Sequence, residues 1–125
     1  MSPRPLNPLE LITRFIFQYW HFDQHKRVVL HSAFYPPRDR RVSVLRISNL
    51  LERTIWDKGR AIGRVAGRSM KARADIQAAS VSEVGLSIDV GTGRTRHADI
   101  VGWEESLILE KATELALRST LRLLE

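Results

Sequence analysis

The 125-residue sequence contains no cysteine, which excludes disulfides, thiolate nucleophiles and cysteine-ligated zinc. It has no run of the roughly 20 apolar residues that a membrane-spanning helix needs, and its N-terminus has neither the apolar segment nor the cleavage site of a signal peptide. Walker, Rossmann and HExxH motifs and a Ser-His-Asp spacing are also missing. We therefore expect a soluble cytoplasmic protein with no cofactor and no membrane association. With 43% apolar residues, it should form a single domain over 1–125.

Acidic residues are scarce in the first part of the chain. Residues 1–75 hold 15 basic and 6 acidic side chains, a balance of +9, whereas residues 76–125 hold 5 and 8, a balance of −3. Sixteen of the basic residues are Arg, whose planar guanidinium can bind a phosphate through two parallel hydrogen bonds. This composition predicts a polyanionic partner, and an acidic protein surface is the alternative.

The segment over 58–73, KGRAIGRVAGRSMKAR, contains six basic residues and no acid. On a helix, its four-residue spacing would place arginines in a row beside a lane of glycines. In a loop, the glycines would leave backbone N–H groups free to face an anion. Both geometries suit a phosphate, and a solvated, mobile segment is the alternative. The predicted nucleic-acid-binding residues are Lys58, Arg60, Gly63, Arg64, Gly67, Arg68, Lys71 and Arg73.

The hydrophobic pattern predicts a small α+β domain. The expected elements are a helix over 9–22, strands over 26–34 and 42–47, a helix over 50–58, a short helix over 68–79, a hairpin over 84–100 and a long helix over 104–124. This gives the order α-β-β-α-(α)-β-β-α, with an antiparallel β-hairpin packed against the long C-terminal helix. Residues 1–35 are expected to form a helical, aromatic N-terminal extension, and residues 42–125 the α+β core.

The hairpin is predicted from strict alternation of apolar and polar residues over 84–90, followed by a three-residue loop at 91–93. In that register Leu86 lies opposite Ala98 on the apolar face, and the polar face collects titratable side chains. His97 could act there as a general base oriented by Asp89 or Asp99. The arginine at position 94 or 96 would supply a cation for the phosphate. A general base and such a cation together would suit RNA cleavage. A solvated polar face is the alternative, so we commit to no catalytic residue.

Aromatic residues crowd the N-terminal segment beyond what one docking face of a helix needs. The residues predicted to form a protein interface are Phe15, Phe17, Tyr19, Trp20 and Phe22. The alternative function is therefore a protein-interaction subunit of a bacterial multiprotein assembly, or a homo-oligomer.

Four side chains between positions 21 and 31 have the chemistry of metal ligands: His21, Asp23, His25 and His31. The cations at positions 26 and 27 would oppose the binding of a metal ion. We predict no metal site.

Two segments resemble parts of the KH module, a small RNA-binding α+β domain. They are IGRVAGRSMK over 62–71 and ADIVG over 98–102. The family's GXXG loop is preceded by an apolar residue and followed by a basic and an apolar one, which Ile62, Arg68 and Met70 match in kind. Here Gly63 and Gly67 enclose three residues instead of two. The resemblance implies a loop that clamps an RNA backbone, while the adjacent helix and strand hold bases.

The segment RHADIVGW over 96–103 looks like the Arg-His-Ala-x-Ile-x-Gly-Trp segment of small uncharacterised bacterial proteins. Those proteins have proline at the next position, where this chain has Glu104. This second resemblance implies no function. The combined prediction is a small basic nucleic-acid-binding module, for RNA in preference to DNA. The alternatives are the protein-interaction subunit and a His97-dependent ribonuclease.

Overall fold

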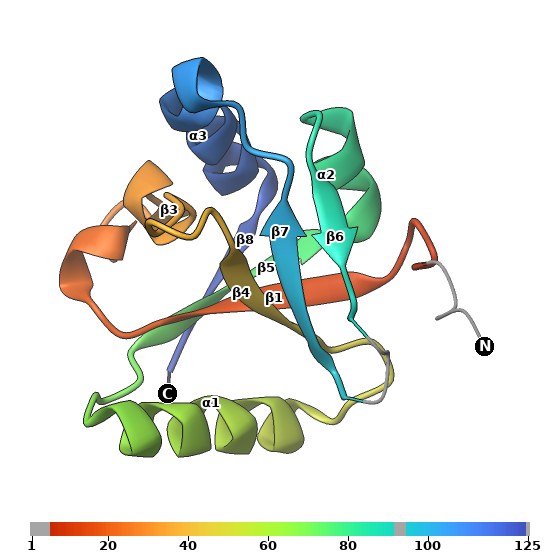
Figure 1. The fold of residues 1–125 in the computed structure, drawn as a ribbon. Coiled ribbons are helices and arrows are strands. Elements are labelled where there is room, and N and C mark those ends of the chain that lie inside the picture. The colour runs from red at the N-terminus through yellow and green to blue at the C-terminus, as the bar shows by residue number, and fades with distance from the viewer. Residues whose placement is uncertain (1–5, 92–94, 125) are drawn as a thin grey trace.

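The computed structural model describes residues 6–91 and 95–124, and its main element is a six-stranded antiparallel sheet (Figure 1). The strand order is β6-β7-β4-β1-β5-β8. The strands are β1 (Leu11–Ile16), β4 (Val42–Arg46), β5 (Ala72–Gln77), β6 (Ser87–Asp89), β7 (His97–Val101) and β8 (Thr120–Leu123). The sheet and its helices confirm the predicted α+β class of a small single domain.

The two faces of the sheet are covered differently (Figure 1). Helix α1 (Glu52–Ala66) lies along one face. The other face carries the remaining elements: α2 (Ala78–Glu83), α3 (Ile108–Arg118), the two-stranded pair β2 (Phe22–Asp23) and β3 (Val28–Val29), and the short helices η1 (Tyr19–His21), η2 (His31–Ala33) and η3 (Glu105–Leu107). Among the described residues, none of these helices is long and apolar enough to cross a bilayer.

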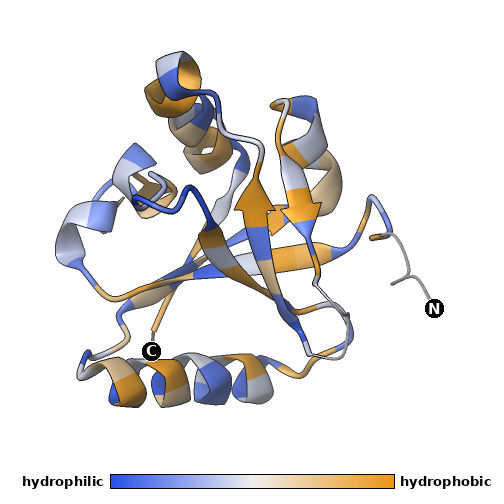
Figure 2. Ribbon diagram, in the orientation of Figure 1, coloured by the Kyte–Doolittle hydropathy of each residue, from blue (hydrophilic) through white to orange (hydrophobic). Residues whose placement is uncertain are grey.

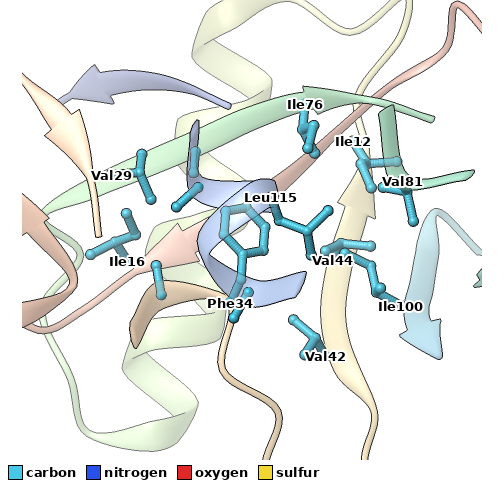
Figure 3. Close-up of a cluster of buried hydrophobic side chains, with 14 of the residues drawn as sticks. Ile12, Ile16, Val29, Phe34, Val42, Val44, Ile76, Val81, Ile100 and Leu115 are labelled. Carbon is cyan, nitrogen blue, oxygen red and sulfur yellow. The ribbon is translucent and has the colours of Figure 1, made fainter. Parts of the chain in front are cut away.

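The larger hydrophobic core lies between the sheet and α3. Alternate residues of the central strands point into it, for example Ile12 and Ile16 from β1 and Ile100 from β7. Leu115 of α3 and Phe34 after η2 close it from the opposite side, as Figure 3 shows. All five of these side chains are fully buried. Each contributes roughly 1.5–3 kcal/mol through the removal of apolar surface from water.

Helix α1 packs closely on the opposite face of the sheet because two of its glycines point inward. A Cβ added to Gly59 would lie 2.4 Å from the Cε of Met70, and one added to Gly63 would lie 2.5 Å from the carbonyl oxygen of Arg68. A small core that includes Phe15 and Ile55 fills the rest of this interface. Figure 2 shows hydrophobic and hydrophilic residues alternating along α1, as an amphipathic helix requires. The lane of glycines expected for a helical geometry is therefore present, and it faces the sheet.

A buried arginine holds the start of α1 on the sheet. Arg73 of β5 is 1% exposed, and its Nη1 and Nη2 each donate to a carboxylate oxygen of Glu52 at 2.8 Å. Its Nε donates to Asp75 at 3.0 Å, and its guanidinium lies 4.7 Å from the ring centroid of Trp56. These carboxylates compensate the buried charge of Arg73. The prediction that Arg73 contacts nucleic acid is therefore wrong, because the side chain is already enclosed and neutralised.

The helix predicted over 9–22 is also wrong, because β1 occupies this segment. β1 is an interior strand that pairs with β4 at Ile12↔Arg46 and with β5 at Ile12↔Ile76. Within the segment predicted as an extension, residues 11–16 are therefore part of the central sheet and not separate from the core. The helical spacing of Ile12 and Ile16 was ambiguous, because residues four apart share a face on a strand as well as on a helix.

The region over 50–79 contains one long helix and a strand instead of two short helices. α1 continues through the predicted loop to Ala66, and Gly67 ends it with a left-handed φ of 69°. β5 then occupies half of the segment predicted as a second helix. The strand predicted over 26–34 is reduced to β3 and η2. The strand over 42–47 is confirmed as β4.

The C-terminal hairpin and helix match the prediction only in part. β6 and β7 are antiparallel, but Ile88 pairs with Ile100, a shift of four residues from the predicted register. An even shift leaves every side chain on its predicted face. The loop predicted at 91–93 lies partly outside the described residues. The last helix ends at Arg118, and β8 follows it as the edge strand beside β5.

Candidate nucleic-acid interface

Helix α1 and the turn after it carry a group of six cations, five of them without acidic partners among the described residues, which we call the basic ridge. Its members are Arg53, Lys58, Arg60, Arg64, Arg68 and Lys71; the first five are exposed and Lys71 is half-buried. Seven residues separate Arg53 from Arg60, and four separate Arg60 from Arg64. These three side chains therefore lie on one side of the helix. Arg60 forms an ion pair with Asp57 at 3.3 Å. Within the described part of the chain, the other five form no ion pair with a carboxylate.

Several cations outside the ridge are neutralised by carboxylates. Arg40 pairs with Glu105 at 2.8 Å, and Arg46 pairs with Glu10 at 2.7 Å. Arg41 bridges two carboxylates on β6 and β7, and Arg118 pairs with a glutamate at the end of α2. Other described cations without a carboxylate partner are spread over separate segments of the chain: Arg14, Lys26, Arg27, Arg38 and Arg96. The five unpaired cations of the ridge instead follow one another along α1 and the turn after it, where they raise the local concentration of anions.

The glycines of the ridge do not form a backbone cradle for phosphate. The N–H of Gly67 donates to the carbonyl of Arg64 at 3.2 Å, and the N–H of Arg68 donates to the carbonyl of Gly63 at 2.7 Å. This pair of hydrogen bonds is the Schellman motif that ends a helix. It uses the N–H groups that the loop geometry would have offered to an anion, and the C-terminal end of a helix carries partial negative charge. Gly63 and Gly67 therefore shape the helix, and only side chains are available for an anion.

Two exposed aromatic rings belong to η1, and one of them contacts the C-terminal end of the ridge. Tyr19 and Trp20 of η1 are 68% and 64% exposed. The Nζ of Lys71 lies 4.3 Å from the centroid of the Tyr19 ring, which joins the aromatic pair to the ridge through a cation–π contact. Figure 1 shows η1 and the C-terminal end of α1 at the same end of the molecule.

The other aromatic residues of the predicted protein interface are not free. Phe15 and Phe22 are buried in the two cores, and Phe17 is partly buried against α1. The alternation of β1 places Phe15 toward α1, where the small core encloses it. The interface prediction is therefore wrong for Phe15 and Phe22, and the structure leaves Tyr19 and Trp20 accessible.

His21 lies close to the cations at this end of the fold. Burial first, and then the positive charges of Arg14 and Arg68, lower the pKa of His21 below 6.5. The ring is therefore mainly neutral at pH 7.

The titratable cluster predicted on the hairpin is present, but it is built around Arg41, which sequence reasoning missed. His97 Nε2 lies 3.3 Å from Asp99 Oδ1. Arg41 donates from Nε to Asp99 at 3.0 Å and from Nη2 to Asp89 at 2.6 Å. The hydrogen bond from Arg41 is the main reason that the pKa of Asp89 is lowered. Because Arg41 is neutralised by two carboxylates, it is a poor partner for a phosphate.

Of the two cations proposed to serve His97, Arg96 is not placed for that role. Arg96 donates to the backbone carbonyls of Arg46 and Ser48 at 3.3 and 3.1 Å, and Arg94 lies outside the described residues. His97, Asp99 and Asp89 thus form an exposed polar network that braces β4, β6 and β7.

Of the four side chains considered as metal ligands, Asp23 accepts a hydrogen bond from the backbone N–H of Lys26 at 2.9 Å. No group of three or more His, Asp or Glu side chains that could hold a metal ion occurs in the part of the chain that the structure describes. The loop that the KH resemblance implies at 63–67 is instead the last turn of α1 and its cap. Comparison of the chain with protein-family models, curated proteins and solved structures found no match.

Proposed function

We propose that this protein is a small cytoplasmic module that binds single-stranded nucleic acid, RNA in preference to DNA. The basic ridge holds phosphates, and Tyr19 and Trp20 stack on bases. One observation carries the proposal. Five cations that form no ion pair with a described carboxylate lie along α1 and the turn after it, and one of them, Lys71, contacts the exposed ring of Tyr19 in η1.

The ridge is suited to a single strand for two physical reasons. α1 has 15 residues and is therefore about 22 Å long, which lets its arginines follow several successive phosphates. Bases of an unpaired strand are free to stack on aromatic rings, at roughly 1–3 kcal/mol for each base. In an A-form duplex the bases are already stacked on one another, so Tyr19 and Trp20 would have no base to contact.

The test is fluorescence anisotropy with a labelled single-stranded RNA over a series of salt concentrations. If the five unpaired cations each neutralise one phosphate, the plot of log affinity against log salt has a slope of about −3.5, which is 5 × 0.7. The double substitution Arg64→Ala and Arg68→Ala removes two of these contacts. It should weaken binding to all RNA sequences and make the slope less steep by about 1.4.

A matched control is Arg38→Ala, which removes one positive charge from an exposed residue outside α1. It should leave the salt dependence almost unchanged. The proposal fails if the wild-type protein shows no binding at low salt. It also fails if Arg38→Ala reduces affinity as much as a single substitution on the ridge.

A protein-interaction subunit is the second candidate, and the exposure of Tyr19 and Trp20 favours it. Large aromatic rings with this exposure are typical of interface anchors. Under this candidate, Trp20→Ser abolishes capture of a partner protein, whereas the ridge substitutions leave capture intact. A self-association detected by light scattering and lost in Trp20→Ser would indicate a homo-oligomer.

A further inference from the structure

A cleft with polar walls lies at the end of the sheet where β1 begins and β4 ends, and we call it the polar cleft. Its volume is about 370 Å³, which is within the range of small-molecule sites. The walls come from the start of β1, the end of β4 and the residue before β7, which are neighbouring strands. The polar residues that line it are Asn7, Glu10, Arg46, Ser48, Asn49 and Arg96.

Two charged side chains of the polar cleft neutralise each other. Arg46 donates from Nε to Oε1 of Glu10 at 2.7 Å and from Nη2 to Oε2 of Glu10 at 3.3 Å. These hydrogen bonds use the Nε–Nη2 edge of the guanidinium, which matches the two oxygens of a carboxylate. The side chain of Glu10 is only 12% exposed. Glu10 is therefore already paired and enclosed, and its charge is compensated by Arg46.

Arg96 is held beside this pair by the backbone of β4. Its Nη1 donates to the carbonyl of Arg46 at 3.3 Å and to the carbonyl of Ser48 at 3.1 Å. Both of these residues also line the cleft. Among the described residues, Arg96 forms no ion pair, and neither its Nε nor its Nη2 donates a hydrogen bond. The backbone thus fixes one end of the guanidinium and leaves the Nε–Nη2 edge, which Arg46 presents to Glu10, without a carboxylate from the described chain.

The polar cleft also offers groups that bind hydroxyls. Oγ of Ser48 accepts a hydrogen bond from the N–H of Leu11 at 2.8 Å, so its O–H is still a donor. Oδ1 of Asn7 accepts from the N–H of Leu9 at 2.9 Å, which leaves its NH₂ group as a donor. The side chain of Asn49 is exposed and forms no hydrogen bond within the described part of the chain.

We propose that the polar cleft binds a small hydroxylated monocarboxylate, such as a sugar acid. Its carboxylate lies on the Nε–Nη2 edge of Arg96, and its hydroxyl groups bind Ser48, Asn7 and Asn49. A guanidinium held in place presents two parallel N–H groups at little cost in side-chain entropy, and this arrangement suits a carboxylate. The proposal is independent of nucleic-acid binding by the basic ridge.

The charge and polarity of the walls select this class of ligand. Two arginines and one glutamate line the cleft, which leaves a net charge of +1. One carboxylate matches that charge, whereas a phosphate dianion would keep an uncompensated negative charge close to Glu10. A hydrocarbon chain would find little apolar surface, because Leu9 is the apolar residue of the described lining.

The test is a titration of the ¹⁵N-labelled full chain, followed by two-dimensional NMR. Gluconate is the probe. Sorbitol keeps the hydroxyls without the charge, hexanoate keeps the carboxylate without the hydroxyls, and inorganic phosphate replaces the carboxylate. Gluconate should bind with a dissociation constant of about 1 mM and shift the backbone amides of Glu10, Ser48, Asn49 and Arg96. Sorbitol and hexanoate should each bind at least roughly 5-fold more weakly, because each loses one set of hydrogen bonds.

Any of three results would overturn the proposal. The first is a lack of shifts at these amides with gluconate up to about 50 mM, well above the expected dissociation constant. The second is binding of sorbitol or hexanoate as tight as that of gluconate, which would mean that the charge or the hydroxyls play no part. The third is binding of inorganic phosphate as tight as that of gluconate, which would mean that the cleft selects negative charge alone.

A substitution of Arg96 tests the carboxylate contact. Arg96→Lys keeps the positive charge but removes the pair of parallel N–H groups, so it should weaken gluconate binding at least about 5-fold. Arg38→Lys is the matched control, because Arg38 is exposed and does not line the cleft. It should bind gluconate as the wild type does. Wild-type affinity in Arg96→Lys would contradict the proposal.

A second variant does not depend on the hydrogen bonds that Arg96 donates to the backbone. Asn49 has a left-handed φ of 66°, which glycine adopts without strain, so Asn49→Gly should fold as the wild type does. It removes one partner of the hydroxyls and should weaken gluconate binding about 3-fold or more, while hexanoate binding stays unchanged. An equal effect on both ligands, or an effect on neither, would refute the proposed hydroxyl contacts.

Discussion

The substitution Gly63→Ala tests whether α1 is seated on the sheet through its glycines. On an exposed helical surface, replacement of glycine by alanine stabilises a protein by about 1 kcal/mol, because alanine has the higher helix propensity. At Gly63 the added Cβ would lie 2.5 Å from the carbonyl oxygen of Arg68 and 3.0 Å from the Phe17 ring. The shortest ordinary contact is 3.4 Å, so the Arg68 backbone would have to move by almost 1 Å.

The cost of that movement exceeds the gain in propensity. The N–H of Arg68 donates to the carbonyl of Gly63 at 2.7 Å, so the shift weakens the cap of α1 by about 1 kcal/mol. Overpacking adds roughly 1–3 kcal/mol. After the propensity gain of about 1 kcal/mol is subtracted, the expected net destabilisation is about 1–3 kcal/mol.

The assay is urea denaturation followed by circular dichroism, with the free energy of unfolding extrapolated to water. The control is Ala61→Gly at an exposed position of the same helix, which should destabilise by about 1 kcal/mol from propensity alone. If Gly63→Ala leaves the free energy of unfolding unchanged or raises it, α1 does not approach the sheet as described, and the reasoning is refuted.

Two further predictions concern titratable groups. The hydrogen bond from Arg73 lowers the pKa of Glu52 below 4.5, so its stabilising effect is complete above pH 4.5 and is lost as pH falls through the lowered value. Glu52→Gln should reduce the free energy of unfolding at pH 7 by about 1 kcal/mol, a value limited by the exposure of the carboxylate. Urea denaturation should show that the free energy of unfolding of the variant depends less on pH below pH 4.5. The same pH dependence in the variant and the wild type would contradict this. His97→Ala should leave RNA binding unchanged, and it should cleave RNA no more slowly than the wild type. Gel analysis of RNA incubated with each protein checks this. If the wild type cleaves RNA and His97→Ala does not, the His97-dependent ribonuclease is established instead.

Local pattern was sufficient to predict several elements. The alternation over 84–90 predicted a strand with the correct buried face, and β4 follows from its β-branched residues. The start of α1 was also near its predicted position. Each of these features depends on residues close together in the chain, where side-chain periodicity and helix-end preferences act directly.

Other elements depended on distant partners and could not be predicted in this way. β1 is a strand because β4 and β5 lie on both sides of it, and the spacing of Ile12 and Ile16 fits either type of structure. The residues of β8 lie within the segment predicted as the last helix. They form a strand because they pair with β5, for example Leu123 with Ala72. β1 pairs with β4 only at Ile12↔Arg46 and Thr13↔Leu45, because the two strands diverge beyond these residues, which no local pattern records.

The sequence by itself determined that positive charge is in excess over 58–73 and that glycines recur there at helical spacing. Tertiary structure decided which of those charges are available. The charge of Arg73 is neutralised by Glu52, which lies 21 positions away in the sequence. Arg64 and Arg68 form no ion pair with a carboxylate among the described residues. Ion pairing depends on which side chains the fold brings within a few ångströms, and that distance is set by strand pairing and helix docking. Charge is thus a property of the sequence, whereas its neutralisation is a property of the fold.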